Sequence, residues 1–298
     1  MDWRRKCLAF WLLEYMPGGT ALYYYLQRNV TKTLPRQPAL LPGYIASAIA
    51  RRDYLLCGGS PSGKTLLEFG AGWDLFHNIV LYCYGFDRQT VVDINPWMRP
   101  ELVNSIIEAL RRDPPPGAVR SPPSLLGTDA REELQRIYGI DYRAPADARH
   151  VDMASNFLDY AATTTTLEHI PFTTLREILQ ECRRLLKPDG IMCMQIDYSD
   201  HFSHADSSIT PYNFLQFSEN TWRRYNPPKQ HQNRRRHSDY GKLFQDLGYR
   251  ILSEEAFRPP NWKPMLDGIR LHPDFVSYNL EDVAATSGTY VLSPNKGG

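Results

Sequence analysis

Residues 64–95 read KTLLEFGAGWDLFHNIVLYCYGFDRQTVVDIN, and this stretch decides the fold. The run at 65–69 is apolar and favours a β-strand. It stops abruptly at Gly70-Ala71-Gly72, where two glycines allow a tight turn. Apolar residues then recur at helical spacing over residues 73–84. The stretch therefore predicts a strand, a glycine turn and a helix, in that order.

A second short strand follows at residues 90–92, and it ends in Asp93. In a parallel sheet the glycine turn lets the backbone approach a ligand, and the helix N-terminus faces that ligand. A carboxylate some twenty residues further on is placed to accept hydrogen bonds from ribose hydroxyls. The layout predicts an α/β protein with a nucleotide-type site at the carboxyl ends of its strands.

Two classes of cofactor use this layout, and the residues discriminate between them. A dinucleotide site requires G-x-G-x-x-G, but Leu75 stands in place of the third glycine. Glu68 and Asp74 flank the turn, and two carboxylates suit a cationic amino group and a sulfonium better than a diphosphate. The segment resembles the E-x-G-x-G motif of class I S-adenosylmethionine-dependent methyltransferases, of the type 11-like kind. An ordinary βα turn is the alternative.

Further segments resemble that family in the same order along the chain. Asp93 matches the acid that holds the ribose, and Asp147 resembles the residue that receives the adenine amino group. Residues 163–170 are similar to the family's fourth-strand segment, which runs beneath the methyl group, and 185–190, LLKPDG, resembles an L-K-P-G-G turn except at Asp189. The resemblance implies S-adenosylmethionine as cofactor, bound by Glu68, Gly70, Ala71, Gly72, Asp93, Ile94, Asp147, Ala148 and Thr165.

The remaining chain supplies the other elements of such a fold. We expect a third strand within 142–150, a fifth at 191–197, and a short helix opened by a capping pair, Asp129 and Glu132. The resemblance implies a Rossmann-like, seven-stranded, mostly parallel sheet with an antiparallel last strand, helices on both faces and an N-terminal helical extension. The strand expected at 289–293 would be that last strand.

Composition is typical of a soluble globular protein. The chain has 298 residues, of which 42% are hydrophobic and 22% charged, and its formal net charge is +1. A near-neutral chain gives no overall attraction to nucleic acid. The five cysteines are scattered, odd in number and without C-x-x-C spacing. We therefore expect reduced thiols and a cytoplasmic location.

The chain divides into two predicted parts. Residues 1–62 form a helical extension or lid, and residues 63–298 form the catalytic domain, with a mobile proline-rich insertion at 111–126. The apolar stretch near the N-terminus is too short to span a bilayer and is interrupted by Glu14. Its aromatic residues are expected to pack on the catalytic domain. A peripheral contact with a membrane surface is the alternative.

Methyl transfer is an in-line displacement, so aligning the acceptor supplies much of the catalysis. A hydroxyl acceptor also requires a base, and histidine is suited to that task near neutral pH. His169 follows the fourth strand and His201 the fifth, at the rim where ligands bind in such sheets. We favour His201 as the base, oriented by Asp197 or Asp200. The alternative is that these histidines are loop residues that cap or pack.

Two other features concern ligands. Asp200, His201, His204 and Asp206 offer ligand atoms within a short segment, but their spacing matches no closed zinc site, so no metal is predicted. Residues 222–242 are rich in arginine and lysine. Such a run is usually a solvated loop, and recognition of an anionic acceptor is the functional alternative. Aromatic residues between 198 and 225 could line an acceptor pocket.

These observations predict a methyltransferase acting on a small molecule, possibly anionic or aromatic, most simply at oxygen. Transfer to nitrogen or carbon by the same fold remains open, because a nitrogen acceptor needs little base. A nicotinamide-dependent oxidoreductase is disfavoured by Leu75 and by the acids around the turn. A non-catalytic cofactor-binding protein is the alternative from a different class.

Overall fold

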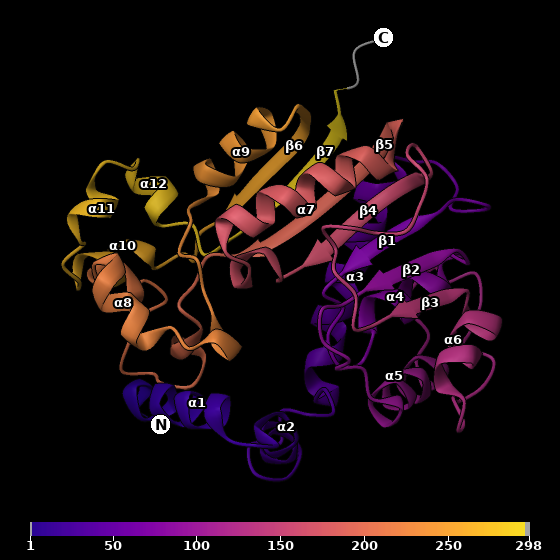
Figure 1. Ribbon diagram of the computed structural model, residues 1–298, viewed down its shortest axis with the longest axis horizontal. Coiled ribbons are helices and arrows are strands. Elements are labelled where there is room, and N and C mark those ends of the chain that lie inside the picture. The colour runs from indigo at the N-terminus through magenta and orange to yellow at the C-terminus, as the bar shows by residue number, and fades with distance from the viewer. Residues whose placement is uncertain (1, 296–298) are drawn as a thin grey trace.

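A seven-stranded sheet forms the centre of the computed structural model, which describes residues 2–295 (Figure 1). The strands lie in the order β3-β2-β1-β4-β5-β7-β6, and β7 is antiparallel to both of its neighbours while the pairs from β3 to β5 are parallel. The predicted fold is therefore confirmed. The strands are β1 (Leu66–Phe69), β2 (Gln89–Val92), β3 (Ile140–Arg143), β4 (Leu158–Thr164), β5 (Leu186–Asp197), β6 (Tyr249–Phe257) and β7 (Ser287–Pro294).

Helices cover both faces of the sheet, because alternate residues of a strand point to opposite sides. In β1, Leu67 and Phe69 pack with the helices on one face, whereas Leu66 packs with those on the other. The first face is covered by α7 (Phe172–Leu185) and α9 (His237–Asp246), and the second by α3 (Leu41–Leu56) and α4 (Phe76–Cys83). Next to α4 lie α5 (Pro100–Arg112) and α6 (Ala130–Tyr138).

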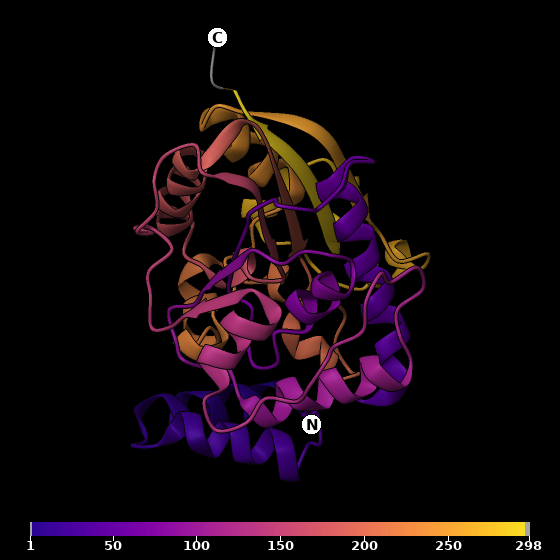
Figure 2. The ribbon, with the colours of Figure 1, turned by 90° about the vertical axis from the view of Figure 1, so that its right-hand side faces the viewer.

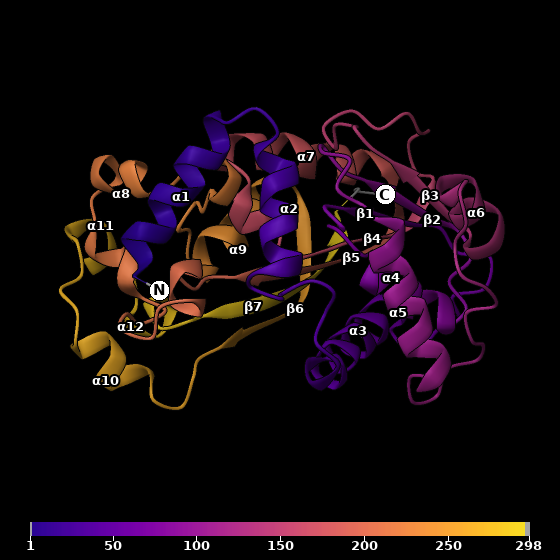
Figure 3. The same ribbon diagram turned by 90° about the horizontal axis from the view of Figure 1, so that it is seen from below.

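The N-terminal helices α1 (Trp3–Tyr15) and α2 (Gly19–Asn29) stand apart from these layers, below the sheet in Figure 1. Figure 3 shows the same two helices side by side across that end of the molecule. Trp3, Cys7 and Phe10 of α1 join an aromatic core with Phe202 and Trp222. The other short helices in that region are η3 (His201–His204), η4 (Asn213–Gln216), α8 (Glu219–Tyr225), η5 (Pro228–Gln230), α10 (Trp262–Asp267), α11 (Pro273–Val276) and α12 (Leu280–Val283).

Several predicted boundaries are wrong, and each has a local cause. The third strand is Ile140–Arg143 rather than a segment within 142–150, because Pro145 has no N–H to continue the ladder. The helix after the glycine turn begins at Phe76, since Leu75 adopts a left-handed conformation with φ of 49°. The capping pair does not form: Asp129 makes no side-chain capping bond.

The proline-rich insertion at 111–126 is fastened to the protein. Its first two residues belong to α5, and the backbone N–H of Val119 donates to the carbonyl of Cys83 at 2.9 Å. The guanidinium of Arg120 donates to the carbonyl of Tyr82 at 2.7 Å and lies over the ring of that residue. Figure 2 shows the molecule from the side on which α5 lies. These contacts hold the segment against α4.

Candidate functional site

The turn between β1 and α4 requires glycine. Gly70 and Gly72 both have φ of +74°, a region that side chains other than glycine rarely adopt. A Cβ atom on Gly70 would lie 2.4 Å from Cγ2 of Thr166, whereas a Cβ on Gly72 would meet nothing within 4 Å. Gly70 therefore allows close packing against the loop after β4. Gly72 borders open space.

Thr165, in the loop after β4, also has an unusual backbone. Its φ is 49°, which is unfavourable for a β-branched residue. Its N–H donates to the carbonyl of Gln195 in β5 at 2.8 Å, so the neighbouring strand holds this conformation. Strained residues of this kind concentrate at ligand-binding sites.

A cavity of about 740 Å³ lies at the carboxyl ends of the strands, and we call it the sheet-end cavity. The ends of β1 and β2, the loops after β3 and β4, the N-terminal helices and residues 228–231 line it. Seven of the nine predicted cofactor-binding residues meet here: Gly70, Gly72, Asp93, Ile94, Asp147, Ala148 and Thr165.

The two acids of this cavity differ in their surroundings. Asp93 is buried, which raises its pKa, although N–H groups of Asn95, Gly72 and Ile94 oppose the effect. Asp147 is held by a bidentate contact with Arg149, at 2.7 and 2.9 Å, and this ion pair lowers its pKa. Asp93 is therefore the more enclosed hydrogen-bond acceptor of the two, and Asp147 lies at a more exposed edge.

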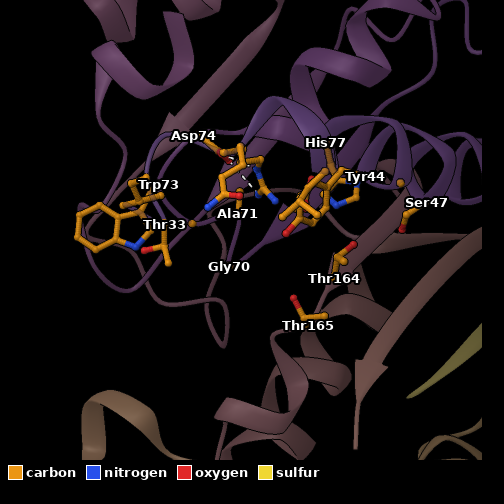
Figure 4. Close-up of a pocket in the computed structure, with 17 residues that line it drawn as sticks. Thr33, Tyr44, Ser47, Gly70, Ala71, Trp73, Asp74, His77, Thr164 and Thr165 are labelled. Atoms are coloured by element: carbon orange, nitrogen blue, oxygen red, sulfur yellow. Dashed lines mark hydrogen bonds and ion pairs between the residues drawn. The ribbon is translucent and has the colours of Figure 1, made fainter. Parts of the chain in front are cut away.

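The other two predicted residues, Glu68 and Ala71, line a second cavity of about 780 Å³, which we call the turn cavity. It lies between the glycine turn and residues 33–47 (Figure 4). In that view Trp73 and Ser47 lie at opposite ends, with Gly70 between them. Gly70, Gly72, Trp73 and Thr165 border both cavities.

Glu68 is buried and already paired. Its carboxylate accepts from Nη1 of Arg51 at 2.9 Å, lies 2.8 Å from Nη2, and accepts from the Asn78 amide at 2.9 Å. Asp74 is similarly engaged, with Nε of Arg36 at 2.6 Å. No sequence pattern marks Arg51 or Arg36 as a partner of these acids. The two acids that flank the turn thus brace it against α3 and the preceding segment.

The predicted catalytic residues form one cluster. Nε2 of His201 lies 3.3 Å from Oδ2 of Asp197, and the rings of His201 and His169 meet edge to face at 4.9 Å. His169 lines the sheet-end cavity, whereas His201 and Asp197 do not border it. Asp200 instead accepts from Asn213 and from the N–H of Phe202. Asp197 is therefore the acid placed to orient His201.

Burial affects the pKa values of the acids and histidines in this cluster. It lowers the pKa of His169 to about 4, with the positive field of His201 acting in the same direction. Burial opposes ionisation of Asp197, but its contacts with His201 and Ser199 outweigh that effect and lower its pKa. Glu168, next to His169, is buried and its pKa is raised well above the usual range. His169 is thus neutral at physiological pH.

Comparison with known proteins identifies the family. The sequence profile of a methyltransferase domain matches residues 41–254, over two thirds of the chain. The chain belongs to this methyltransferase family. Its cofactor is S-adenosylmethionine, as the sequence predicted. A search of curated protein sequences finds no match.

Solved structures share the fold of this methyltransferase. The PH0226 protein of Pyrococcus horikoshii superposes with a TM-score of 0.51 at 15% identity, covering 91% of this chain and 98% of that chain. Phosphoethanolamine N-methyltransferase 2 of Haemonchus contortus, solved with S-adenosyl-L-methionine, gives a TM-score of 0.50 at 12% identity, covering 84% of this chain and 53% of that one. At these identities the likeness concerns the fold.

The sheet-end cavity of the methyltransferase fits its cofactor chemically. Asp93 presents a buried carboxylate at the end of β2, where ribose hydroxyls would find an acceptor. Gly72 has no side chain and borders open space, so a ligand can approach its backbone closely. Within residues 2–295 no helix has the length and apolar composition needed to cross a bilayer.

The N-terminal helices also line this cavity, as the predicted lid would, but the residues involved were not predicted. Glu14, Thr20 and Tyr23 come from these helices, and Lys229 and His231 from the segment after α8. Lys229 and Glu14 form an ion pair at 3.3 Å, which joins α1 to the segment after α8. No local motif marks these residues, since their role depends on how α1 and α2 pack.

The basic stretch at 222–242 is mixed: Arg223, Arg224, Arg235 and Lys242 are exposed, as a solvated loop would be, but two other arginines are buried. Arg236 is fully buried and donates to the carbonyls of Tyr198, Val283 and Ala285. Arg234 is also buried and donates to the carbonyls of Phe214 and Phe217. These two guanidinium groups are therefore neither solvated nor free to receive an anionic acceptor. Lys229 is the member of the run that borders the cavity.

Proposed function

We propose that this methyltransferase transfers a methyl group to an oxygen atom of a small-molecule acceptor bound in the sheet-end cavity. The observation that carries the proposal is the histidine cluster beside that cavity, with Asp197 3.3 Å from His201. Transfer to oxygen requires removal of a proton, and this cluster supplies the nitrogen atoms for it. Residues of the N-terminal helices line this cavity of about 740 Å³, and this enclosure supports a small-molecule acceptor.

The cavity residues divide the cofactor between them. Asp93 would accept hydrogen bonds from the ribose hydroxyls, and Asp147 with Ala148 would hold the adenine. Gly70, Gly72 and Thr165, which line the same cavity, would hold the methionine end. Glu68 acts indirectly, because its carboxylate holds the turn through Arg51 and Asn78.

When bound, S-adenosylmethionine supplies an electrophilic methyl group: the acceptor oxygen bonds to its carbon as the carbon–sulfur bond breaks and leaves the electron pair on sulfur. His201 does not border the cavity, so the hydroxyl proton would reach it by way of His169, whose ring meets that of His201 at 4.9 Å. Asp197 would stabilise the imidazolium that forms. His169 stays neutral because it is buried, and it positions the acceptor at the cavity wall.

The test is His201→Ala, assayed with pools of hydroxylated acceptors while the demethylated cofactor is followed. We expect unchanged affinity for S-adenosylhomocysteine and a fall in turnover of ~10² or more. His204→Gln is the matched control, since His204 lies in the same helix η3 but is directed to Ser199. Unchanged turnover in His201→Ala would remove the base and favour a nitrogen or carbon acceptor.

A further inference from the structure

Three potential metal ligands converge beside the sheet-end cavity. Glu168 and His169 belong to η2 (Leu167–His169) after β4, and His201 belongs to η3 after β5. One ligand atom from each residue lies within 4.8 Å of the others. β4 and β5 are adjacent and parallel, so their carboxyl ends bring these two segments together. This set differs from the sequence-adjacent acids and histidines at 200–206.

Glu168 is the unusual member of the set. The residue is 3% exposed, and both carboxylate oxygens are buried without a hydrogen-bond partner among the described residues. Burial raises the pKa of Glu168 and the negative charge of Asp197 adds to that effect, whereas the backbone N–H groups of Glu168 and Asp197 oppose it. Buried carboxylates in proteins are normally protonated, paired or bound to a metal. A cation bound here would compensate the charge that burial disfavours.

His169 is arranged as metal-binding histidines usually are, and His201 has a buried nitrogen beside it. Nδ1 of His169 lies 2.7 Å from the carbonyl oxygen of His231, which can only accept, so Nδ1 carries the proton. Its Nε2 consequently holds a free lone pair. Such a bond from the second ring nitrogen to a carbonyl orients metal-binding histidines. Nε2 of His201 is buried without a hydrogen-bond partner in residues 2–295, and Asp197 lies beside it.

We infer that Glu168, His169 and His201 form a binding site for a divalent cation of the first transition series. Two imidazoles and a carboxylate suit Zn²⁺, Fe²⁺ or Mn²⁺, whereas Mg²⁺ and Ca²⁺ favour oxygen ligands. Ligand atoms about 2.1 Å from a tetrahedral ion lie about 3.4 Å apart, so side-chain movements of about an ångström would close the set. Asp197 is placed to become a fourth ligand.

The inference rests on the proposed function and refines it. With a cation bound, His201 is a ligand rather than a base. An acceptor hydroxyl at the open position of the cation would lose its proton to solvent water, because coordination lowers its pKa. The cation would thus favour acceptors that carry a second oxygen next to the reacting hydroxyl. The two oxygen atoms of such an acceptor could occupy two coordination positions of the ion.

The experiment uses the full chain without an affinity tag, freed of metal by chelator and titrated with Zn²⁺ in a calorimeter. Co²⁺ is the second probe, because its absorption spectrum reports the ligands directly. Glu168→Gln removes a ligand but leaves both imidazoles, and it keeps the shape of the side chain. His204→Gln is the control, since its ring stacks on His201 at 5.1 Å but lies outside the set.

We expect one equivalent of Zn²⁺ on the native protein and on His204→Gln. In Glu168→Gln the dissociation constant should rise by about 100-fold or more. Absence of stoichiometric uptake by the native protein, or equal affinity in Glu168→Gln, would overturn the site. S-adenosylhomocysteine binding is measured on the same samples. If the native protein does not bind S-adenosylhomocysteine, the proposed function is overturned instead. If the chelated protein still transfers methyl groups, the cation is not needed for the reaction and His201 remains the base.

Discussion

The ion pair between Arg51 and Glu68 joins α3 to the strand that carries the glycine turn. Both side chains are buried, with 0% and 3% of their surfaces exposed. The guanidinium contacts both carboxylate oxygens and also donates to Oγ1 of Thr164 at 3.1 Å. Arg51→Met removes the cation but keeps most of the volume, so it isolates the electrostatic contribution.

Removing one partner of a buried pair leaves an uncompensated charge and costs about 3–5 kcal/mol of unfolding free energy. The amide of Asn78 still donates to Glu68 at 2.9 Å, so we expect a loss near the lower end of that range, about 3 kcal/mol. Replacing both partners removes the orphaned charge as well. Arg51→Met/Glu68→Met should therefore be more stable than Arg51→Met alone.

Urea unfolding followed by tryptophan fluorescence measures these differences. Arg52→Met is the matched control, because Arg52 pairs with the exposed Asp53 and such surface pairs contribute about 0–1 kcal/mol. The reasoning is refuted if Arg51→Met loses no more stability than Arg52→Met, or if the double variant is no more stable than Arg51→Met alone. Either result would mean that Glu68 does not depend on Arg51.

Three further outcomes follow from other contacts. Burial opposes ionisation of Asp159, but its ion pairs with Lys187 and Lys64 outweigh that effect and lower its pKa. The stability that these ion pairs contribute is therefore fully present above the unfolded pKa of about 3.9. Asp159→Asn should consequently lower the melting temperature at pH 7, with the difference from the native protein shrinking as the pH falls below 3.9 toward the folded value. Gly70→Ala should weaken or abolish folding, measured by circular dichroism, because its Cβ would lie 2.4 Å from Thr166. Asp93→Asn should raise the dissociation constant of S-adenosylhomocysteine by about 10-fold or more in calorimetry, since hydrogen bonds to a charged group are lost; an unchanged constant would remove Asp93 from the ribose site.

The parts of the fold that depend on local sequence patterns could be predicted from the sequence. The glycine turn, the strands on either side of it and the antiparallel end of the sheet follow from periodicity, turn chemistry and family resemblance. The third strand was misplaced because the residues after Arg143 look equally extended. Only the missing N–H of Pro145 and the pairing with β2 fix where that strand ends.

Burial of charged groups is what the sequence could not reveal. Arg51, Arg236 and Glu168 are charged residue types that are rarely buried, so a sequence reading places them in solvent. Their partners lie far along the chain: Arg236 binds carbonyls at 198, 283 and 285. Such contacts exist only once the fold has brought the segments together. The orphaned Glu168 is therefore visible in the structure alone.

The N-terminal helices offer a final test of whether they form a lid over the cavity. Trp3 is 2% exposed and packs edge to face on Tyr225 at 4.9 Å. Its backbone N–H donates to Asp206 at 2.7 Å, a bond that Trp3→Ala would keep. Trp3→Ala should release α1 from the loop after β5, because truncating a buried tryptophan costs about 3–5 kcal/mol.

Release of α1 removes part of the cavity roof but leaves the strand ends intact. We therefore expect Trp3→Ala to show faster proteolysis within residues 4–30 and a lower turnover, with little change in affinity for S-adenosylhomocysteine. Leu8→Ala is the control, since Leu8 is 60% exposed on the same helix. If Trp3→Ala instead weakens cofactor binding tenfold, α1 is part of the cofactor site, because the strand ends alone would then be unable to hold the ligand.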